Sequence, residues 1–366
     1  MSLAEGMRQA LTYHWHPVCT AAELPGPLAV RLLGRDLVVA RLGDDDGDGQ
    51  VVALPDRCPH RSTRLSVGVV DGARLRCAYH GWTFDAGGRC TEIPSMPDGP
   101  IPGRAHVEAF DADVRHGLVW VRLDGSAGTE IPPCPAFDDP EMKVLSGQPY
   151  TWPVSALRRV ENFVDLAHFA FVHDGSLGRR DRPVPPLPDI ERAGSELRFA
   201  YDPPMPDELA EEAMLAASAY RMPMPCTVDI EFRYADGRRR RLWMTASPHD
   251  DGSCRTFWCI GRTDDLAGDD RAHLAFQAQV IAEDEPVVCN HVPPELPLDP
   301  ADELSVRTDK VSIEYRRWLR DLATAATSGP NTYAATLGIH PTDPTRSAAS
   351  PPLPGGSPPE RSLTTG

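Results

Sequence analysis

The sequence predicts an α+β protein with two domains: an all-β first part, then a part that combines helices with an antiparallel sheet. Three observations lead to this prediction. The chain of 366 residues exceeds one ordinary domain, so its length favours two separate cores. Short alternating apolar runs fill the first part. In the second part, helical patterns flank three runs that are typical of strands.

The first part runs from Tyr13 to about Asp124 and contains runs such as LAVRLLG, LVVARLG and VVALP, which Gly, Asp and Pro interrupt. These runs predict antiparallel strands, and HGLVWVRLDG reads as the closing strand. The stretch SAGTEIPPCP that follows is rich in turn and breaker residues. We therefore expect a first domain over 1–124, including a short N-terminal lead-in, and a second over 136–340.

The second part opens with VSALRRVENFVDLAHFAFVH, whose apolar residues are too dense for an exposed helix, so it predicts one buried helical segment. The runs TVDIEFRYA, RRLWMTASP and RTFWCIGRT, separated by ADG and HDDG, predict a meander of three strands. A long helix is expected from about Asp269 to Val288, interrupted near its end by Pro286, and a last one over 313–326. Residues 341–366 have the composition of a disordered tail.

Charge and cysteine content narrow the class of protein. The net charge of −16 argues against nucleic acid and anionic membranes as partners. Nine scattered cysteines do not resemble a secreted disulfide framework and indicate a reducing compartment. The first residues lack a basic region followed by an apolar one, and no apolar run is long enough to span a bilayer. We expect a cytoplasmic protein.

A first metal motif pairs Cys58-x-His60 with Cys77-x-x-His80 after a gap of sixteen residues. Two cysteines on one iron and two histidines on the other describe a Rieske [2Fe–2S] centre. A structural zinc site is the alternative, because two cysteines and two histidines also satisfy tetrahedral Zn²⁺. However, zinc sites usually space the ligands of a pair by two to four residues, and a single residue separates Cys58 from His60.

A second motif holds Asn162, Asp165, His168 and, five residues later, His173. On a helix, the first three recur every three to four positions and so share one face. Either histidine taken singly is more typical of a satisfied core residue. Together they indicate a metal site, because two histidines and one carboxylate on one side of Fe(II) leave positions open for O₂ and substrate.

The carboxylate must come from elsewhere in the chain, and VIAEDEPVV offers three acidic residues in an apolar helical setting. Burying a charge there is costly unless it is paired or binds a metal. Asp284 is the best candidate, and Glu283 and Glu285 are rivals that point to other faces of the helix.

The motifs CPHR, CAYHGWTFD and GGRCTEIP, within about Trp15 to Trp120, closely resemble the Rieske domain of aromatic-ring and related oxygenases. Asn-x-x-Asp-x-x-His-x₄-His and AEDEPVV resemble the catalytic domain of the same family, especially its short members similar to vanillate O-demethylase oxygenase and aminopyrrolnitrin oxygenase. The resemblance implies a helix-grip (START-like) second domain. It also implies a cluster on Cys58, His60, Cys77 and His80 and a mononuclear iron on His168, His173 and Asp284.

By the same resemblance, Asp165 bridges His168 to His80 of the partner subunit in a homotrimer, while Asn162 supports the iron pocket. A carboxylate that only orients His168 is the simpler alternative. Two departures are visible. Many family members have Gly-Ala-Pro where this chain has Ser62, Thr63 and Arg64, and many have Glu where it has Cys289.

The expected function is oxygenation of a small, largely apolar or aromatic organic substrate by O₂, as a monooxygenase or dioxygenase. Hydroxylation, oxidative demethylation and amine oxidation all remain open. The resemblance also implies electrons from NAD(P)H through a separate reductase, with or without a ferredoxin, and the sequence, which has no dinucleotide fingerprint, is consistent with such an external donor. An electron-transfer Rieske protein and a zinc-stabilised binding module are the alternatives. Six apolar residues are candidates for lining the substrate pocket: Phe163, Phe169, Phe171, Val172, Met244 and Trp258.

Overall fold

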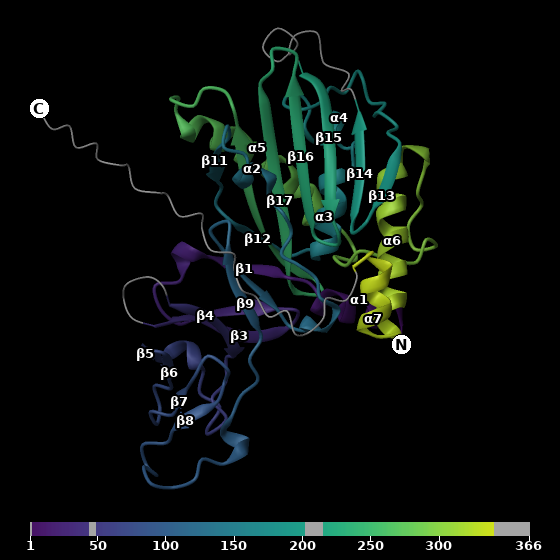
Figure 1. The fold of residues 1–366 in the computed structure, drawn as a ribbon. Helices are drawn as coiled ribbons and strands as arrows, with labels where there is room; N and C mark the ends of the chain where they lie inside the picture. The colour runs from purple at the N-terminus through teal and green to yellow at the C-terminus, as the bar shows by residue number, and fades with distance from the viewer. Residues whose placement is uncertain (1, 44–48, 202–214, 340–366) are drawn as a thin grey trace, which may run out of the picture.

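Three small antiparallel sheets form the first part of the chain (Figure 1). The computed structural model describes residues 2–43, 49–201 and 215–339, so the expected tail over 341–366 lies outside the described residues. The sheets have the strand orders β1-β10-β9, β2-β3-β4 and β5-β6-β7-β8. The strands are β1 His16–Thr20, β2 Leu28–Leu32, β3 Arg35–Leu42, β4 Gln50–Pro55, β5 Val69–Asp71, β6 Arg74–Arg76, β7 Thr83–Phe84, β8 Cys90–Glu92, β9 Asp111–Arg115 and β10 Leu118–Arg122.

The second part is one antiparallel sheet with the order β11-β18-β17-β16-β15-β14-β13, and β12 also pairs with β18. The expected meander is therefore confirmed as β16, β17 and β18. The strands are β11 Lys143–Ser146, β12 Tyr150–Trp152, β13 Ile190–Ala193, β14 Glu196–Tyr201, β15 Leu215–Pro223, β16 Thr227–Tyr234, β17 Arg239–Asp250 and β18 Ser253–Arg262. The helices are α1 Leu3–Thr12, α2 Pro135–Asp138, α3 Ala156–Val164, α4 Phe169–Val172, α5 Asp270–Val288, α6 Lys310–Thr327 and α7 Pro330–Thr336.

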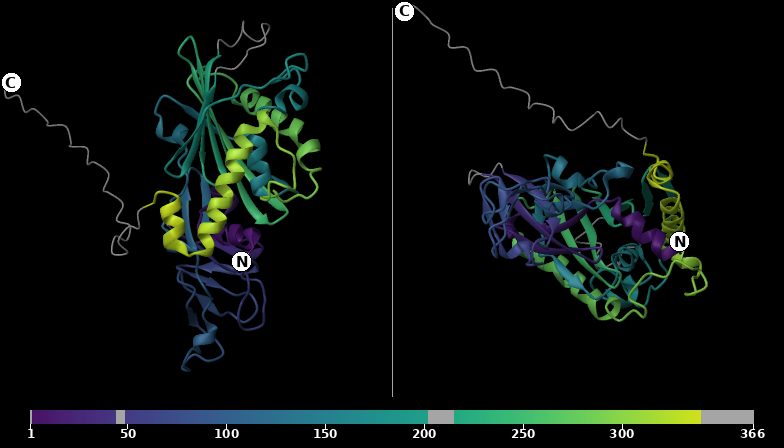
Figure 2. Two further views of the ribbon diagram at one scale, coloured as in Figure 1. Left: turned by 90° about the vertical axis from the view of Figure 1, so that its right-hand side faces the viewer. Right: turned by 90° about the horizontal axis from the view of Figure 1, so that it is seen from below.

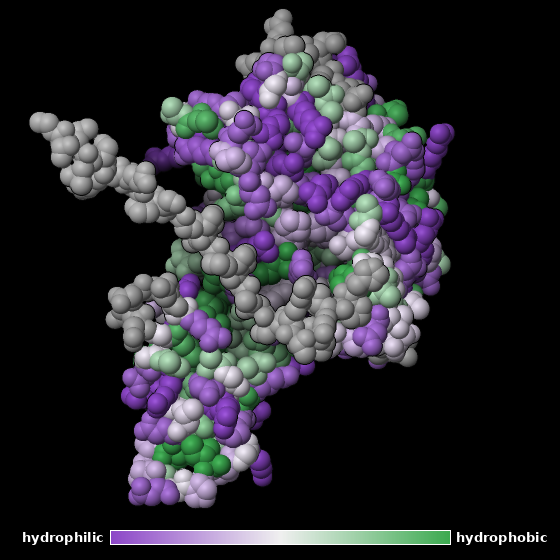
Figure 3. Space-filling view, in the orientation of Figure 1, coloured by the Kyte–Doolittle hydropathy of each residue, from purple (hydrophilic) through white to green (hydrophobic). Residues whose placement is uncertain are grey.

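Helices α3, α5 and α6 cover one face of this sheet (Figure 2). Alternation along the strands divides the residues between the two faces. On β16 and β17, Ile230 and Met244 join the core under the helices. On the opposite face, Arg241 forms ion pairs with Asp229 at 2.5 Å and with Glu231 at 3.3 Å. The surface over these strands is accordingly mostly hydrophilic in Figure 3.

The N-terminal helix α1 packs against α6 of the second domain, which lies next to it in Figure 2. Gly6 makes this approach possible, since a Cβ atom there would lie 2.3 Å from the carbonyl oxygen of Ala323. The lead-in that precedes the first domain therefore contributes Met7, Ala10 and Leu11 to the core of the second.

The two parts are joined by a shared apolar cluster. Trp120 of β10 meets Trp243 of β17 with ring centroids 6.2 Å apart, and the indole N–H of Trp243 donates to the carbonyl of Pro133 at 3.0 Å. Cys134 and Cys259 complete the same cluster. No helix within the described ranges is long and apolar enough to cross a membrane.

Two helix predictions need correction. The segment expected as one helix over 154–173 consists of α3 and α4 with a break between Asp165 and His168. Asp165 ends α3 in an extended conformation, with φ −77° and ψ 110°, so the shared-face argument for Asp165 and His168 was wrong. Conversely, Pro286 does not interrupt α5, which continues to Val288. Pro286 has no amide N–H to donate to the carbonyl of Ala282, so α5 lacks one hydrogen bond there, and only two more helical residues follow.

Candidate metal centres

Two loops of similar shape carry the first motif, one after β4 and one between β6 and β7. In the first loop, the amide N–H of Cys58 donates to the carbonyl of Thr63 at 2.8 Å. In the second, the N–H of Cys77 donates to the carbonyl of Trp82 at 2.8 Å, again five residues along the chain. Each loop thus folds back on its cysteine in the same way, and the two motifs face each other.

The departure at residue 62 lies at the tightest point of the first loop. Ser62 has φ +59°, in the left-handed region, and Gly81 takes the equivalent position in the second loop with φ +73°. Ser62 compensates for its strain with a side-chain contact, since Arg57 donates to its Oγ at 2.8 and 3.0 Å. The loop keeps its shape without the glycine that many family members have there.

The four residues suit a cluster with two irons. Cys58 and Cys77 are 2% exposed, whereas His60 and His80 lie toward the surface with ring centroids 4.4 Å apart. The Nδ1 atom of His60 is buried and has no hydrogen-bond partner, as a nitrogen reserved for a metal would be. Burial raises the pKa of Cys58 to about 11, so at neutral pH a bound metal would be needed to hold this sulfur as a thiolate.

A single zinc ion does not fit this arrangement. Tetrahedral ligands at bond lengths near 2.0–2.3 Å bring their donor atoms within roughly 4 Å of one another. Among the described residues, the one group of three or more His, Cys, Asp or Glu ligand atoms within 4.8 Å is His168, His173 and Asp284. The four residues of the two loops are spread more widely, as a two-iron cluster requires.

The second motif meets Asp284 at the break between α3 and α4. Oδ1 of Asp284 lies 3.4 Å from Nε2 of His168 and 3.3 Å from Nε2 of His173. The break turns both imidazoles toward α5, which a continuous helix would not allow. Of the three acidic candidates Glu283, Asp284 and Glu285, Asp284 is the one whose carboxylate completes the triad, while Glu285 is exposed.

Carboxylates hold the outer nitrogens of both imidazoles. Nδ1 of His173 lies 2.8 Å from Oε2 of Glu283, and Nδ1 of His168 lies 3.5 Å from Oδ2 of Asp165. Such carboxylates fix the ring orientation of metal-bound histidines. Glu283, which the sequence left open as an alternative ligand, therefore contacts His173 at Nδ1, the ring nitrogen that points away from Asp284.

Electrostatics at the triad favour a cation. Burial alone would lower the pKa of His168, but the carboxylates of Asp165 and Asp284 raise it to about 9. Burial would raise the pKa of Asp284, yet His168, His173 and Arg159 hold it well below its usual range. The triad therefore stabilises positive charge, and its two-histidine, one-carboxylate set suits Fe(II).

Asn162 also reaches this group, since its Nδ2 lies 3.4 Å from Oδ1 of Asp284. Sequence reasoning missed Arg159, whose guanidinium donates to Oδ2 of Asp284 at 3.1 Å and also contacts Asn162. A signal was available: Arg159 is a charged residue in a dense apolar helix, three positions before Asn162 and therefore on its face.

A cavity of about 650 Å³ opens onto the triad. Of the six pocket candidates, Phe163, Phe169 and Met244 line the cavity. The other three do not line it: Phe171 is exposed, Trp258 belongs to the core, and Val172 is half-buried outside the cavity wall. Further apolar walls come from the sheet and from α5: Ile230, Phe232, Leu242, Ile260, Val280 and Ile281. The site can enclose a small, largely apolar molecule beside a metal.

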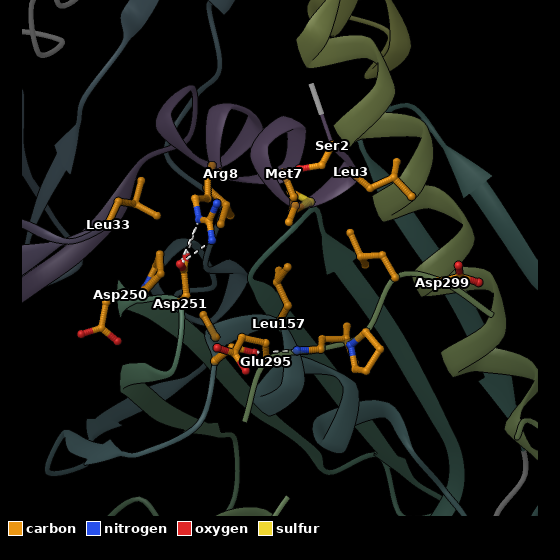
Figure 4. A pocket seen from close by; sticks show the side chains of 18 of the residues that line it. Ser2, Leu3, Met7, Arg8, Leu33, Leu157, Asp250, Asp251, Glu295 and Asp299 are labelled. Carbon is orange, nitrogen blue, oxygen red and sulfur yellow. Dashed lines mark hydrogen bonds and ion pairs between the residues drawn. The ribbon is translucent and has the colours of Figure 1, made fainter. Parts of the chain in front are cut away.

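A second cavity, of about 490 Å³, lies between α1, the start of α3 and the segment 295–299 (Figure 4). Leu3, Met7 and Leu157 line it, and Arg8 donates to Asp251 at 2.8 Å on its rim. Its described lining includes no histidine or cysteine, so it does not share the chemistry of the first cavity.

Comparison with known proteins assigns both parts. Residues 14–111 match the Rieske [2Fe-2S] domain, and residues 152–325 match the vanillate O-demethylase oxygenase C-terminal domain. Methylxanthine N1-demethylase NdmA of Pseudomonas putida is 41% identical over 341 residues, covering 90% of this chain and 94% of the relative. The chain belongs to the Rieske oxygenases.

Two further similarities extend this assignment. Methylxanthine N3-demethylase NdmB of Pseudomonas putida is 41% identical over 333 residues, covering 87% of this Rieske oxygenase and 91% of the relative. The solved structure of NdmA with caffeine matches with a TM-score of 0.84 and 39% identity, covering 94% of this chain and all of that one. Dicamba monooxygenase, at 22% identity and a TM-score of 0.73, shares the fold.

Membership settles the class of protein. The chain is an oxidoreductase with a [2Fe–2S] cluster and a mononuclear iron, and the α+β architecture with a helix-grip second domain is confirmed. The electron-transfer alternative is not supported, because the second domain matches that of an oxygenase. The zinc-module alternative is not supported either, because the first domain matches a Rieske [2Fe-2S] domain.

Proposed function

We propose that this Rieske oxygenase removes a methyl group from a ring nitrogen of a small aromatic heterocycle. The supporting observation is the apolar cavity of about 650 Å³ that opens onto His168, His173 and Asp284. Its volume and its walls suit a fused ring system. The relatives that match nearly the whole chain at 41% identity are both N-demethylases, which favours demethylation over the other oxygenations.

The balanced reaction converts an N-methyl group, O₂, two electrons and two protons into an N–H group, formaldehyde and water. His168, His173 and Asp284 would hold the iron, and the iron would activate O₂ when bound. The side chains around it bind and orient the substrate and exclude water. Phe163, Phe169 and Met244 supply apolar contact.

Polar groups in the cavity wall favour a heterocycle over a hydrocarbon. Ser218 and Tyr220 of β15 line the cavity and are 1% and 2% exposed. Their hydroxyl groups interact with that of Tyr201, which also lines the cavity, so a small network of hydroxyl groups faces the substrate space and can hydrogen-bond ring carbonyls or ring nitrogens. A purely apolar ligand would leave these groups with fewer partners.

Product analysis tests the reaction. Purified enzyme, supplied with a reductase and NADH, is incubated with caffeine or theobromine as N-methyl probes. Formaldehyde and a demethylated ring are expected in equal amounts. A hydroxylated ring without formaldehyde would overturn demethylation. His168→Ala is expected to abolish product formation and to leave the visible spectrum of the cluster intact, and Met244→Trp to weaken substrate binding by filling the cavity.

The cofactor assignment has a separate test. Full occupancy predicts about three irons and about two acid-labile sulfides per chain. His168→Ala is expected to lose about one iron and no sulfide. Sulfide-free protein would contradict the cluster, and wild-type protein with about two irons and full sulfide would contradict the mononuclear site.

We also propose a homotrimer in which each mononuclear site receives electrons from the cluster of the next subunit. The loops that carry His60 and His80 lie at the opposite end of the molecule from α4 and α5 in both figures, which favours transfer between subunits (Figures 1 and 2). Asp165 is 35% exposed at its side chain and so is accessible to His80 of the partner subunit. A ring built from one repeated head-to-tail contact satisfies this requirement.

Mixed trimers test the transfer between subunits. Cys77→Ser removes a cluster ligand and His168→Ala an iron ligand, so each variant alone is expected to be inactive. Co-expressed chains are expected to regain part of the wild-type activity, because a variant without cluster has a neighbour that carries one. Inactivity of co-purified mixed trimers would contradict the proposal. Native mass spectrometry measures the oligomeric state.

A separate reductase is the proposed electron source. Oxidoreductase NdmD of Pseudomonas putida matches over 120 residues with 39% identity, which is 32% of this chain and 20% of that protein. We propose direct reduction by an NAD(P)H-dependent reductase, and added ferredoxin tests whether a further carrier increases turnover. We propose the cytoplasm as the compartment, since none of the nine cysteines forms a disulfide bond.

A further inference from the structure

Arg159 is a fully buried cation directly behind the triad. It lies on α3 and is 1% exposed. Its guanidinium carbon is 4.2 Å from the ring centre of Phe163 and 4.4 Å from that of Trp152. Aromatic rings stabilise a cation, but taking a charge out of water remains costly unless it has hydrogen-bond partners of opposite charge.

The donors of Arg159 go to three partners: Tyr150, Asp284 and, from the same nitrogen that reaches Asp284, Oδ1 of Asn162. Its Nε and one terminal nitrogen donate to the hydroxyl of Tyr150 at 3.0 and 2.8 Å. Its other terminal nitrogen donates to Oδ2 of Asp284 at 3.1 Å. Tyr150 therefore fixes the plane of the guanidinium, and the guanidinium fixes one oxygen of Asp284.

This contact gives the two oxygens of Asp284 different partners. Oδ2 faces Arg159, while Oδ1 faces Nε2 of both His168 and His173 at 3.4 and 3.3 Å. A carboxylate can bind a metal through one oxygen or through both. The guanidinium occupies one lone pair of Oδ2 and repels a cation from that oxygen, so Asp284 presents Oδ1 to the metal.

Arg159 also compensates for excess negative charge around the triad. Three carboxylates, those of Asp165, Glu283 and Asp284, contact the two histidines. Together with a divalent cation and neutral imidazoles they sum to one negative charge. The guanidinium of Arg159 brings the sum to zero, which reduces the cost of burying the site.

We propose that Arg159 is a positioning residue for the mononuclear site, which restricts Asp284 to one metal-bound oxygen and offsets the excess carboxylate charge. This inference rests on the proposed role of His168, His173 and Asp284 as ligands. Its consequence for function is an open position on the metal, because a second oxygen of Asp284 would occupy a position that O₂ or substrate needs.

The neighbouring Arg158 provides a matched control. It is also buried, at 3% exposure, and lies on the same helix. Its terminal nitrogens pair with Glu303 at 2.8 and 3.1 Å, and it also donates to the backbone carbonyls of Pro293 and Glu295, away from the triad. Arg158→Met and Arg159→Met each remove a buried guanidinium from α3. A difference in metal binding between the two variants therefore reports on the metal site.

The experiment measures Co(II) binding to enzyme that retains its cluster but has lost its mononuclear iron. Calorimetry gives the affinity. Cobalt K-edge absorption gives the coordination number without interference from the iron of the cluster. Arg159→Met is expected to bind Co(II) roughly tenfold more tightly, because a repelling charge is removed, and with a higher coordination number, because Oδ2 becomes free.

Tighter Co(II) binding with a higher coordination number is expected only if Arg159 positions Asp284. If Arg159 merely supported the fold, its loss would weaken metal binding. Arg158→Met is expected to match the wild type in both measurements. Affinity and coordination in Arg159→Met equal to the wild type, or weaker binding, would overturn the proposal. If Arg159→Met does not fold, Arg159→Gln is measured, since its neutral amide keeps a donor in the cage. Tighter binding supports the charge role, and unchanged or weaker binding overturns it.

The wild-type measurement separates this inference from the ligand assignment. Wild-type enzyme that binds no Co(II), or binds it equally after His168→Ala, contradicts the assignment of the triad itself. Wild-type binding that depends on His168 but not on Arg159 contradicts the role of Arg159 alone.

Discussion

Nδ1 of His168 lies 3.5 Å from Oδ2 of Asp165, and it is a buried nitrogen without a hydrogen-bond partner among the described residues. The other oxygen of Asp165 is engaged, because Oδ1 accepts the amide N–H of Ala167 at 2.9 Å. Asp165 is thus anchored in the break between α3 and α4, with Oδ2 directed at the imidazole and part of its side chain exposed. It can contact His168 and, in the proposed trimer, a neighbouring subunit at once.

Asp165→Asn is expected to retain the mononuclear metal and to slow electron transfer to it by tenfold or more, because the charged link to the imidazole is lost. Rapid-mixing single turnovers with reduced enzyme measure the rate, and iron analysis checks retention. Asp236→Asn, an exposed turn residue, is the control. Wild-type single-turnover rates in Asp165→Asn would contradict the bridge.

Glu283→Gln is expected to weaken Fe(II) binding roughly tenfold to a hundredfold. Its Oε2 lies 2.8 Å from Nδ1 of His173 and accepts from Ser176 at 2.7 Å, so the charge that orients and polarises this imidazole is lost. Iron content after dialysis against a weak chelator is the measurement. The neighbouring Glu285→Gln, on the exposed face of α5, should keep its iron. Equal retention in both variants would exclude the role of Glu283.

Gly6→Ala is expected to lower the stability of the folded chain by about 1–3 kcal/mol, since the added methyl would overlap the backbone of α6. A Cβ at Gly6 would lie 2.3 Å from the carbonyl oxygen of Ala323, whereas one at Gly26 would meet nothing within 4 Å. Thermal unfolding of Gly6→Ala and of the control Gly26→Ala compares the two sites. A similar melting temperature in both would show that α1 can shift without cost.

Acid is expected to destabilise the contact between the lead-in and α7. Burial lowers the pKa of His14 to about 3 and that of His16 to about 4, from an ordinary value of 6.5. Below pH 6.5 the two histidines are protonated in the unfolded chain but stay neutral in the folded chain. The free energy of unfolding therefore falls as the pH drops from 6.5 toward the two lowered pKa values. At pH 5 the loss is about 2 kcal/mol for each histidine.

Urea unfolding at pH 8 and pH 5 measures this loss. His14 contacts the hydroxyl of Tyr333 at 2.7 Å through Nε2, so His14→Asn removes one titrating group at the same interface. The variant is expected to be less stable at pH 8 and to lose about 2 kcal/mol less between the two pH values. An unchanged difference between pH 8 and pH 5 would show that His14 is not the responsible group.

Local patterns in the sequence were enough to predict most of the candidate metal-binding residues. The spacing of Cys58, His60, Cys77 and His80 predicts a two-iron cluster, because these residues lie in two short loops whose shape depends on neighbours in the chain. Strand alternation likewise predicted the meander of β16, β17 and β18. The same reasoning failed between Asp165 and His168, because helical periodicity does not reveal a break that tertiary contacts stabilise.

The sequence by itself determined which residue types could bind iron and where along the chain they occur. Only the tertiary structure decided which carboxylate meets the histidines, since Glu283, Asp284 and Glu285 are adjacent and the rotation of α5 against α3 selects among them. It also placed Arg159 against Asp284, 125 residues away. Contacts of this kind depend on how helices pack over the sheet, and short-range patterns carry no information about that packing.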